Sequence, residues 1–266
     1  MELQSLKQSA NLVEFLLSMR RSFGEDRLAK KVSVAFLGYT DIMLNKKEWN
    51  ETGLLVEKLV NRPNRDRLKA IHGRSDVDIV PSLPSLLTSI FGPKVNLSIF
   101  DFTHYEGSEI KHDFNYEIPA EYHNKFDLII DNGTIEHIFN LPQALINVKK
   151  MLKLQGVVFH VGPMIMPNHG FYSYNPTLFA DFYEANGFSI EDLIMRGNYN
   201  FEGRQETATI SGIPKYERFS LPSVLREQPA LAVLEWNLLV LAMKKQEISD
   251  TIWPIQHKYR AKEQWV

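Results

Sequence analysis

Short apolar runs, each closed by glycine or aspartate, alternate along this chain with segments of helical periodicity. The runs Val32–Leu37, Val95–Phe100, Phe126–Ile130 and Val157–Val161 are rich in β-branched and aromatic residues. Continuous apolar runs of this length are typical of strands that are buried on both faces of a parallel sheet. Helices between such strands supply the crossover connections. We therefore predict an α/β fold with a mostly parallel sheet that helices cover on both faces.

The helix that follows the Phe126 run is the best specified of the helical segments. It is predicted to run from Asn140 to Leu152. Asn140 and Gln143 have the spacing of a capping box, and Gly156 is expected to end the element. The buried apolar stripe consists of Leu141, Ala144, Leu145, Val148 and Met151. A second helix should open at Asn175-Pro176 and end at Gly187. Earlier helices are predicted over residues 46–60 and Leu83–Phe91.

Three regions are expected along the chain. Residues 1–27 form a leading helix that Gly24 is placed to end, and that packs on the body or on a partner. Residues 28–245 form the main domain, with a polar, basic connection at 61–78 and a mixed insert at about 197–229. Residues 246–266 form a tail whose two tryptophans could cover a neighbouring subunit, as in a homo-oligomer, or fold back on their own core.

Charge and composition exclude several partners. Lysine and arginine number 30 against 32 acidic residues, so no net field attracts nucleic acid or an anionic membrane. The longest nearly apolar run, residues 230–243, contains Glu235 and is too short to cross a bilayer. The absence of cysteine excludes disulfides and thiolate metal sites and agrees with a cytoplasmic location. A small-molecule partner is expected.

Common catalytic motifs are missing. The sequence has no Walker loop, no G-x-S-x-G elbow and no H-E-x-x-H pair. Glu136 and His137 are sequence neighbours, and their side chains should diverge on a strand or a helix. No metal site is therefore predicted.

Polar groups and glycines follow three of the predicted strands. Gly38 ends the first, Asp101 the second, and Asp131-Asn132-Gly133 the third long one. Ligands of open parallel sheets bind beyond the carboxyl ends of the strands, where an acid can accept hydrogen bonds from ribose hydroxyls. A glycine turn permits close approach of a ligand to the backbone. The arrangement favours a nucleoside-containing ligand.

The segment "FDLIIDNGTIEHIFNLPQALINVKKMLKLQGVVFHVGP" resembles class I S-adenosylmethionine-dependent methyltransferases. In that family a strand, an "N-G-x-x-E-H" turn, a helix, "L-K-x-x-G" and another strand follow one another. The stretch "GFYSYNPTLFADFYEANGF" is similar to the next part of the family, and Glu235–Met243 fits its reversed seventh strand. The resemblance covers about residues 31–245. It implies a three-layer, doubly wound, seven-stranded sheet with a reversed last strand.

The resemblance also implies a cofactor, S-adenosylmethionine, and residues that hold it. Asp101 would bind the ribose, Asp113 would lie near the adenine amine, and Asp131, Asn132 and Gly133 would lie beside the methionine moiety. Gly38 would be the first glycine of the cofactor loop, with Tyr39 next to it. Phe36, Thr40 and Ile42 stand where the family usually has an acid and two further glycines.

Methyl transfer requires an aligned acceptor and, for a hydroxyl or amine, a base. His137 and His169 are the candidate bases. The loop "PNHGFYSYNP" offers Asn168, Tyr172 and Tyr174 as substrate-binding side chains. His160 lies inside a predicted strand, where a hydrogen-bonded core histidine is expected.

Two alternatives to a methyltransferase remain open. A methyltransferase-like binding or scaffold protein could have lost the cofactor loop, since "FLGYTDI" departs from the glycine-rich pattern. A different nucleotide-binding enzyme, such as one that uses a dinucleotide, is the other alternative, although G-x-G-x-x-G is absent.

Overall fold

The computed structural model describes residues 12–55, 79–104, 109–201, 204–213, 215 and 236–260. The predicted connection at 61–78 and the first part of the leading helix lie outside these ranges. The chain divides into two compact units. The first contains Met1–Val34 and Tyr39–Leu97, and the second contains Ala35–Gly38 and Ser98–Val266.

The first unit contains three described helices. They are α1 (Leu12–Leu28), α2 (Lys46–Thr52) and α4 (Leu83–Phe91). The prediction of α4 is confirmed at both ends, whereas α2 ends before Gly53, which has a φ of 65°. Gly24 was expected to end the leading helix, and with a φ of 69° and a ψ of 165° it does interrupt it, so that α1 consists of two helical stretches joined at a kink. Among the residues that the structure describes, no helix is both long and apolar enough to cross a membrane.

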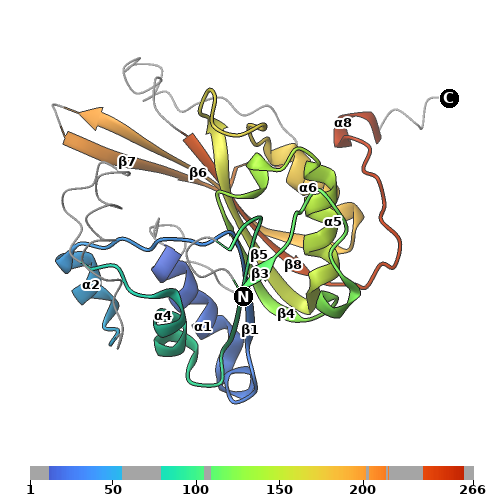
Figure 1. Ribbon diagram of the computed structural model, residues 1–266. Coiled ribbons are helices and arrows are strands. Elements are labelled where there is room, and N and C mark those ends of the chain that lie inside the picture. The colour runs from blue at the N-terminus through green and yellow to red at the C-terminus, as the bar shows by residue number, and fades with distance from the viewer. Residues whose placement is uncertain are drawn as a thin grey trace. The chain divides into compact units, whose positions relative to one another are not determined.

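A single sheet dominates the second unit (Figure 1). The strand order is β3-β2-β1-β4-β5-β8-β6-β7, and β8 runs antiparallel to both of its neighbours. The predicted mostly parallel α/β sheet with a reversed last strand is therefore confirmed. The strands are β1 (Ser33–Leu37), β2 (Asn96–Asp101), β3 (Ile110–Lys111), β4 (Phe126–Asn132), β5 (Leu152–Ile165), β6 (Phe188–Phe201), β7 (Arg204–Ser211) and β8 (Trp236–Lys244).

The number of strands differs from the seven predicted. The sheet described here has eight, because part of the expected insert at 197–229 forms β7. Strand β6 continues to Phe201 and pairs antiparallel with β7, from Ile194 opposite Ser211 to Phe201 opposite Arg204. The insert therefore extends the sheet as a hairpin.

Two helices of the second unit have the caps that the sequence predicts. Helix α5 (Leu141–Met151) has Asn140 as its N-cap, whose side chain accepts a hydrogen bond from the Gln143 backbone. Helix α6 (Pro176–Ala185) has Asn175 in the same role, with Thr177 as the donor. Gly156 does not end the helix as expected, because α5 already ends at Met151. Strand β5 begins at Leu152, directly after α5, and Gly156 lies inside it where the register with β4 shifts.

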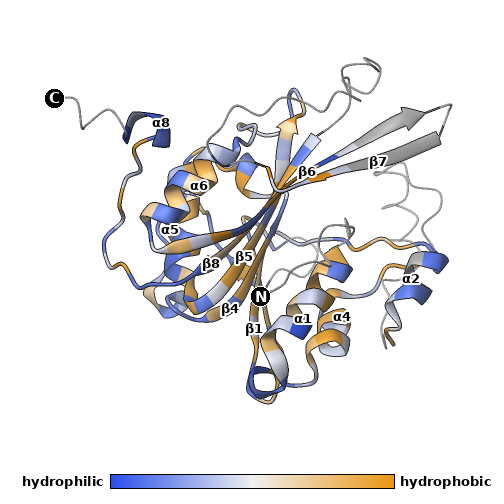
Figure 2. Cartoon of the chain, turned by 180° about the vertical axis from the view of Figure 1, so that it is seen from behind, coloured by the Kyte–Doolittle hydropathy of each residue, from blue (hydrophilic) through white to orange (hydrophobic). Residues whose placement is uncertain are grey.

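Helices α5 and α6 cover one face of the sheet and bury a continuous apolar core (Figures 1 and 2). Their apolar stripes supply Leu145 and Val148 from α5 and Phe179 and Tyr183 from α6. These side chains pack on strand residues of the same face, among them Ala35, Ile129, Val158, Leu193, Val240 and Ala242. The capped, amphipathic helices thus hold the strands that carry the site.

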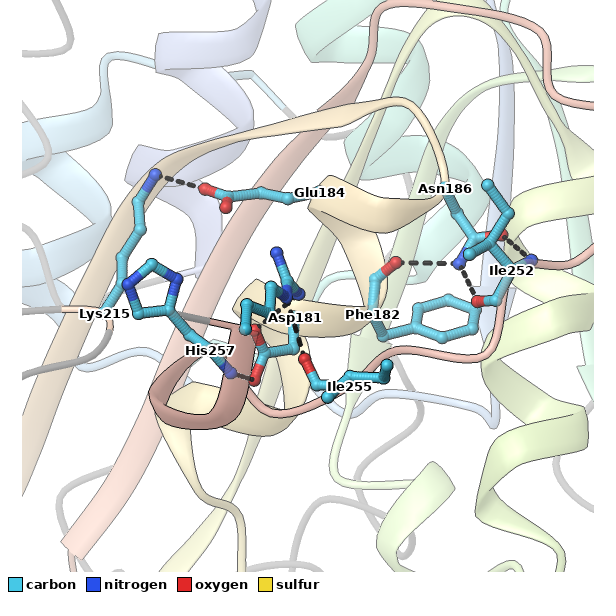
Figure 3. Close-up of polar contacts among 9 residues, drawn as sticks. Asp181, Phe182, Glu184, Asn186, Lys215, Ile252, Ile255 and His257 are labelled. Carbon is cyan, nitrogen blue, oxygen red and sulfur yellow. Dashed lines mark hydrogen bonds and ion pairs between the residues drawn. The ribbon is translucent and has the colours of Figure 1, made fainter. Parts of the chain in front are cut away.

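The described part of the C-terminal tail folds back onto α6 (Figure 3). Buried Asn186 accepts a hydrogen bond from the Ile252 backbone at 3.0 Å and donates one to the Ile252 carbonyl at 2.9 Å. Buried Asp181 accepts from the His257 backbone at 3.1 Å and forms an ion pair with Arg260 at 2.8 Å. The tail is described up to Arg260, which ends helix α8 (His257–Arg260). Its backbone lies against α6, but the side chain of Trp253 is 66% exposed and is not buried in the core.

A buried network, which we call the lysine network, lies where β4 and β5 begin. It consists of Lys149, Lys244, Asn124 and Asn186. The Lys244 ammonium, 2% exposed, donates to the carbonyls of Lys149 and Leu152 and to the Asn124 amide, at 2.9 to 3.2 Å. Lys149 donates to Asn186 at 3.1 Å and to the Asp250 carbonyl at 2.7 Å. Both buried ammonium groups therefore have several acceptors.

Candidate functional site at the carboxyl edge of the sheet

The carboxyl ends of β2, β1 and β4 are tied together by hydrogen bonds at one edge of the sheet. The Gly38 backbone donates to the Phe100 carbonyl at 2.7 Å, and the Thr134 hydroxyl donates to the Leu37 carbonyl at 2.6 Å. A Cβ on Gly38 would lie 2.4 Å from the Thr134 hydroxyl, and the φ of Gly38 is 74°. Only glycine therefore fits this approach.

The two acids expected to bind the nucleoside lie on neighbouring segments of this edge. Asp101 is half-buried at the end of β2, and one carboxylate oxygen accepts from the Thr103 backbone at 3.0 Å. The His112 backbone donates to the Asp101 carbonyl. Asp113 directly follows His112, so its backbone lies near that of Asp101. Asp113 accepts from the Asn115 backbone and amide at 2.9 and 2.7 Å. Tyr39 is half-buried and belongs to the first unit, not to the unit that contains this edge.

Asp131 has a different environment from the one expected for a cofactor ligand. Its side chain is 0% exposed, and one oxygen accepts from the backbones of Thr134 and Ile135. The other oxygen lies 2.7 Å from His160, whose second nitrogen lies 2.6 Å from the Tyr183 hydroxyl. The carboxylate is thus occupied by protein groups and fixes the turn after β4. The expectation that His160 is a hydrogen-bonded core residue is confirmed.

The next two residues carry the accessible part of this turn. Asn132 is exposed, and Gly133 has a φ of 86°. Both follow β4 directly, so their backbone is the part of the segment that a ligand at this edge can reach.

Glu136, which the sequence interpretation left without a role, is the least satisfied group of the site. It lies in the short helix η4 (Ile135–His137) and is 1% exposed. Its Oε2 accepts from the Tyr174 hydroxyl at 3.2 Å. Among the residues that the structure describes, no donor reaches Oε1 in hydrogen-bonding geometry. Burial, together with the charge of Asp131, raises the pKa of Glu136 to about 7.

The loop after β5 is fastened to Glu136 by its backbone. The Phe171 backbone donates to the Glu136 carbonyl at 2.8 Å. Gly170, with a φ of 74°, lies so close that a Cβ would be 2.8 Å from that carbonyl oxygen. Asn168 also has a positive φ, 63°, so the loop turns sharply on either side of His169. This turn places the His169 imidazole beside Glu136.

Glu136, His137 and His169, which we call the Glu136 cluster, converge at this point. Oε1 of Glu136 lies 3.8 Å from Nε2 of His137 and 3.5 Å from Nε2 of His169. One possible ligand atom from each of the three residues lies within 4.8 Å of the other two. The expected divergence of Glu136 and His137 is wrong, because η4 is a tight turn rather than a regular helix or strand. Burial lowers the pKa of His137, and the charge of His169 lowers it further. Two imidazoles and a carboxylate at these distances could hold a metal ion.

The other residues predicted to bind substrate lie around this cluster. Tyr174 is 3% exposed, and its hydroxyl contacts Glu136 from the buried side, where Gly162 leaves room for the ring. Tyr174 therefore supports Glu136 from the buried side and does not offer an exposed surface to a substrate. Tyr172 donates to the Phe139 carbonyl at 2.7 Å. Asn168 is exposed, as is an edge-to-face pair of rings, Phe139 and Phe171, with centroids 5.4 Å apart.

Comparison with known proteins gives structural likeness only. No protein-family model matches the chain, and no curated protein does. A SAM-dependent methyltransferase from Aquifex aeolicus is similar at 12% identity and a TM-score of 0.40, over 92% of this chain and 99% of that one. One from Archaeoglobus fulgidus is 13% identical with a TM-score of 0.40, over 91% and 97%. A Burkholderia thailandensis 1,6-didemethyltoxoflavin-N1-methyltransferase, solved with S-adenosylhomocysteine, is 12% identical with a TM-score of 0.35, over 87% and 79%.

Proposed function

We propose that this protein transfers a methyl group from S-adenosylmethionine to a small-molecule acceptor. The observation that carries the proposal is the edge formed by β2, β1 and β4, where Gly38, Asp101 and the backbone of Asn132-Gly133 lie at adjacent strand ends. Crevices beyond such strand ends are where α/β sheets bind nucleosides. The sequence resemblance of the Phe126–Phe188 segment to methyltransferases supports the same cofactor.

In this proposal each residue has a separate task. Asp101 accepts hydrogen bonds from the ribose hydroxyls, and Asp113 lies toward the adenine. The Gly38 turn gives the ligand access to the backbone, and Asn132 and Gly133 face the methionine end. The carboxylate of Asp131 holds the turn in place from below, through Thr134 and Ile135.

The acceptor would lie over the loop after β5. The methyl group moves in line from the sulfonium to an acceptor oxygen or nitrogen, so the protein mainly aligns the two partners. A neutral imidazole of His137 or His169 can remove the acceptor proton, and the lowered pKa of His137 keeps it neutral at pH 7. Phe139, Phe171 and Tyr172 offer an apolar wall that suits an aromatic acceptor.

Calorimetric titration with S-adenosylmethionine and S-adenosylhomocysteine tests the cofactor. We expect binding of both, and a loss of about tenfold or more in affinity for Asp101→Ala, since hydrogen bonds to a charged group contribute about 1.5–3 kcal/mol. Asp127→Asn is the matched control, because Asp127 pairs with Lys153 at the opposite end of β4. Absence of binding at millimolar ligand would overturn the proposal and favour the scaffold alternative, which Phe36, Thr40 and Ile42 motivate.

A further inference from the structure

We propose that the Glu136 cluster binds one divalent transition-metal ion through a Glu136 carboxylate oxygen and the Nε2 atoms of His137 and His169. One carboxylate and two imidazoles form a donor set that is common among catalytic zinc sites and among open sites of other first-row metals. Three protein ligands leave at least one coordination position for water or substrate.

The distances fit such an ion. Metal bonds of about 2.0–2.1 Å at tetrahedral angles separate two ligand atoms by about 3.4 Å. The two contacts of Oε1 with the histidine nitrogens measure 3.5 and 3.8 Å. Both imidazoles are about half exposed, so they can close on an ion by small rotations, whereas the carboxylate is fixed.

The unsatisfied oxygen is an independent indication of a ligand. Buried polar atoms almost always have a hydrogen-bond partner. Oε1 of Glu136 has none among the described residues, while Oε2 is held by the Tyr174 hydroxyl. The free oxygen is the one that the two histidines approach. A cation at this point would supply the missing partner.

Contacts of the backbone and of one side chain keep the ligands in place without the ion. The Phe171 amide and Gly170 hold the His169 loop against the Glu136 carbonyl. Tyr174 supports the carboxylate from behind, as outer groups around metal ligands commonly do. The site is therefore largely formed before an ion arrives.

The ion also deepens the proposed function, on which this part of the inference rests. A hydroxyl of the acceptor that occupies the open position would lose its proton more easily, because a divalent cation lowers the pKa of a bound oxygen. The oxygen would then attack the methyl carbon, its proton having gone to solvent. Histidines that bind a metal through Nε2 cannot be bases through that atom, so the ion would replace them in this task.

Metal titration of the full chain tests the site without reference to the cofactor. The protein is stripped with a chelator and titrated with Zn²⁺ by calorimetry, and with Co²⁺ by its visible absorption. We expect one ion per chain, d–d bands of a low-symmetry Co²⁺ site, and much weaker binding of Mg²⁺, which prefers oxygen ligands.

Variants assign the ligands. Glu136→Gln, His137→Ala and His169→Ala should each lower the affinity at least about tenfold, and Tyr174→Phe by less. His123→Ala is the matched control, since His123 precedes β4 at the opposite end of the strand and should leave binding unchanged. Circular dichroism confirms that each variant is folded. No binding at millimolar Zn²⁺ and Co²⁺, or binding that survives His137→Ala combined with His169→Ala, would overturn the site.

Activity distinguishes this inference from the proposed function. If the stripped protein binds S-adenosylhomocysteine but transfers methyl groups only after Zn²⁺ or Co²⁺ is restored, the ion has the role described. If methyl transfer proceeds equally well in the presence of chelator, the catalytic role of the ion is wrong, while the cofactor proposal stands. If metal binds and the cofactor does not, the metal site stands and the proposed function fails.

Discussion

The two ends of the sheet bury polar groups in opposite ways. Where β4 and β5 begin, the lysine network gives each buried ammonium several acceptors. Where β4 ends, the equally buried Glu136 has one oxygen held by Tyr174 and one without a partner. The sheet supplies a rigid frame for both, so the difference lies in the side chains and loops at each end.

This difference separates stability from function. A buried polar group with all its hydrogen bonds contributes to a unique structure, whereas an unsatisfied one costs free energy unless a ligand compensates it. The lysine network also ties the C-terminal tail to α6, through Asn186 (Figure 3). Variants at the two ends should therefore differ in sign and size of their effect on stability.

The largest effect is expected at the lysine network. Lys244→Met keeps the length of the side chain but leaves the carbonyls of Lys149 and Leu152 and the Asn124 amide without their donor. We expect a loss of about 3–5 kcal/mol in the free energy of unfolding, measured by urea denaturation. Lys245→Met is the control, since Lys245 is partly exposed and its ion pair with Glu191 should contribute less than about 1 kcal/mol. Equal losses in the two variants would mean that the buried hydrogen bonds of Lys244 stabilise the fold no more than the partly exposed ion pair of Lys245 does.

An intermediate effect is expected at the loop that carries His169. Gly170→Ala places a Cβ 2.8 Å from the Glu136 carbonyl oxygen, in addition to straining a φ of 74°. Gly212→Ala is matched to it, because Gly212 has a φ of 68° and, apart from its chain neighbours, no atom of the described residues lies within 4 Å of the added Cβ. The strain alone costs about 1–2 kcal/mol, so the melting temperature should fall in both variants and further in Gly170→Ala. Only Gly170→Ala should also weaken metal binding.

The smallest effect on stability is expected at Glu136 itself. Glu136→Gln removes a buried charge that lacks a full set of hydrogen-bond partners. Without metal, the free energy of unfolding of the variant should therefore lie within about 1 kcal/mol of that of the parent chain, or be higher. Asp131→Asn changes a carboxylate of the same edge whose oxygens accept from Thr134, Ile135 and His160, and it should cost about 2–3 kcal/mol. Urea denaturation after treatment with chelator makes the comparison. A large loss for Glu136→Gln would show that Oε1 has a structural partner.

Much of the frame could be predicted from local sequence. Continuous apolar runs identified β1, β2, β4 and β5, and the side chains of Asn140 and Asn175 marked the starts of α5 and α6. Strand β7 could not be identified in this way. It lies at the end of the strand order, and Gln205, Glu206, Thr207 and Thr209 interrupt the apolar pattern that a buried strand would have.

The site was predictable in part. His137 and His169 were predicted as candidate bases from their positions after strands. Glu136 was considered only together with His137, as a possible metal pair, and was given no role. Its burial and its contact with His169 depend on the hydrogen bond between Phe171 and the Glu136 carbonyl, which joins two loops far apart in sequence. Likewise, Asp131 looked free in the sequence because its partners, His160 and the turn at Thr134, are brought to it only by the sheet.

The position of β8 between β5 and β6 has a consequence for how the chain is made. Strands β5 and β6 both precede β8 in sequence. During synthesis, the edges that will pair with β8 therefore stay unpaired until residues 236–244 have left the ribosome. Exposed strand edges are templates for pairing with other chains. Nascent chains that stall before this point should be prone to aggregate and should depend on chaperones, because β8, the last of the described strands to emerge, is the one that pairs with both edges.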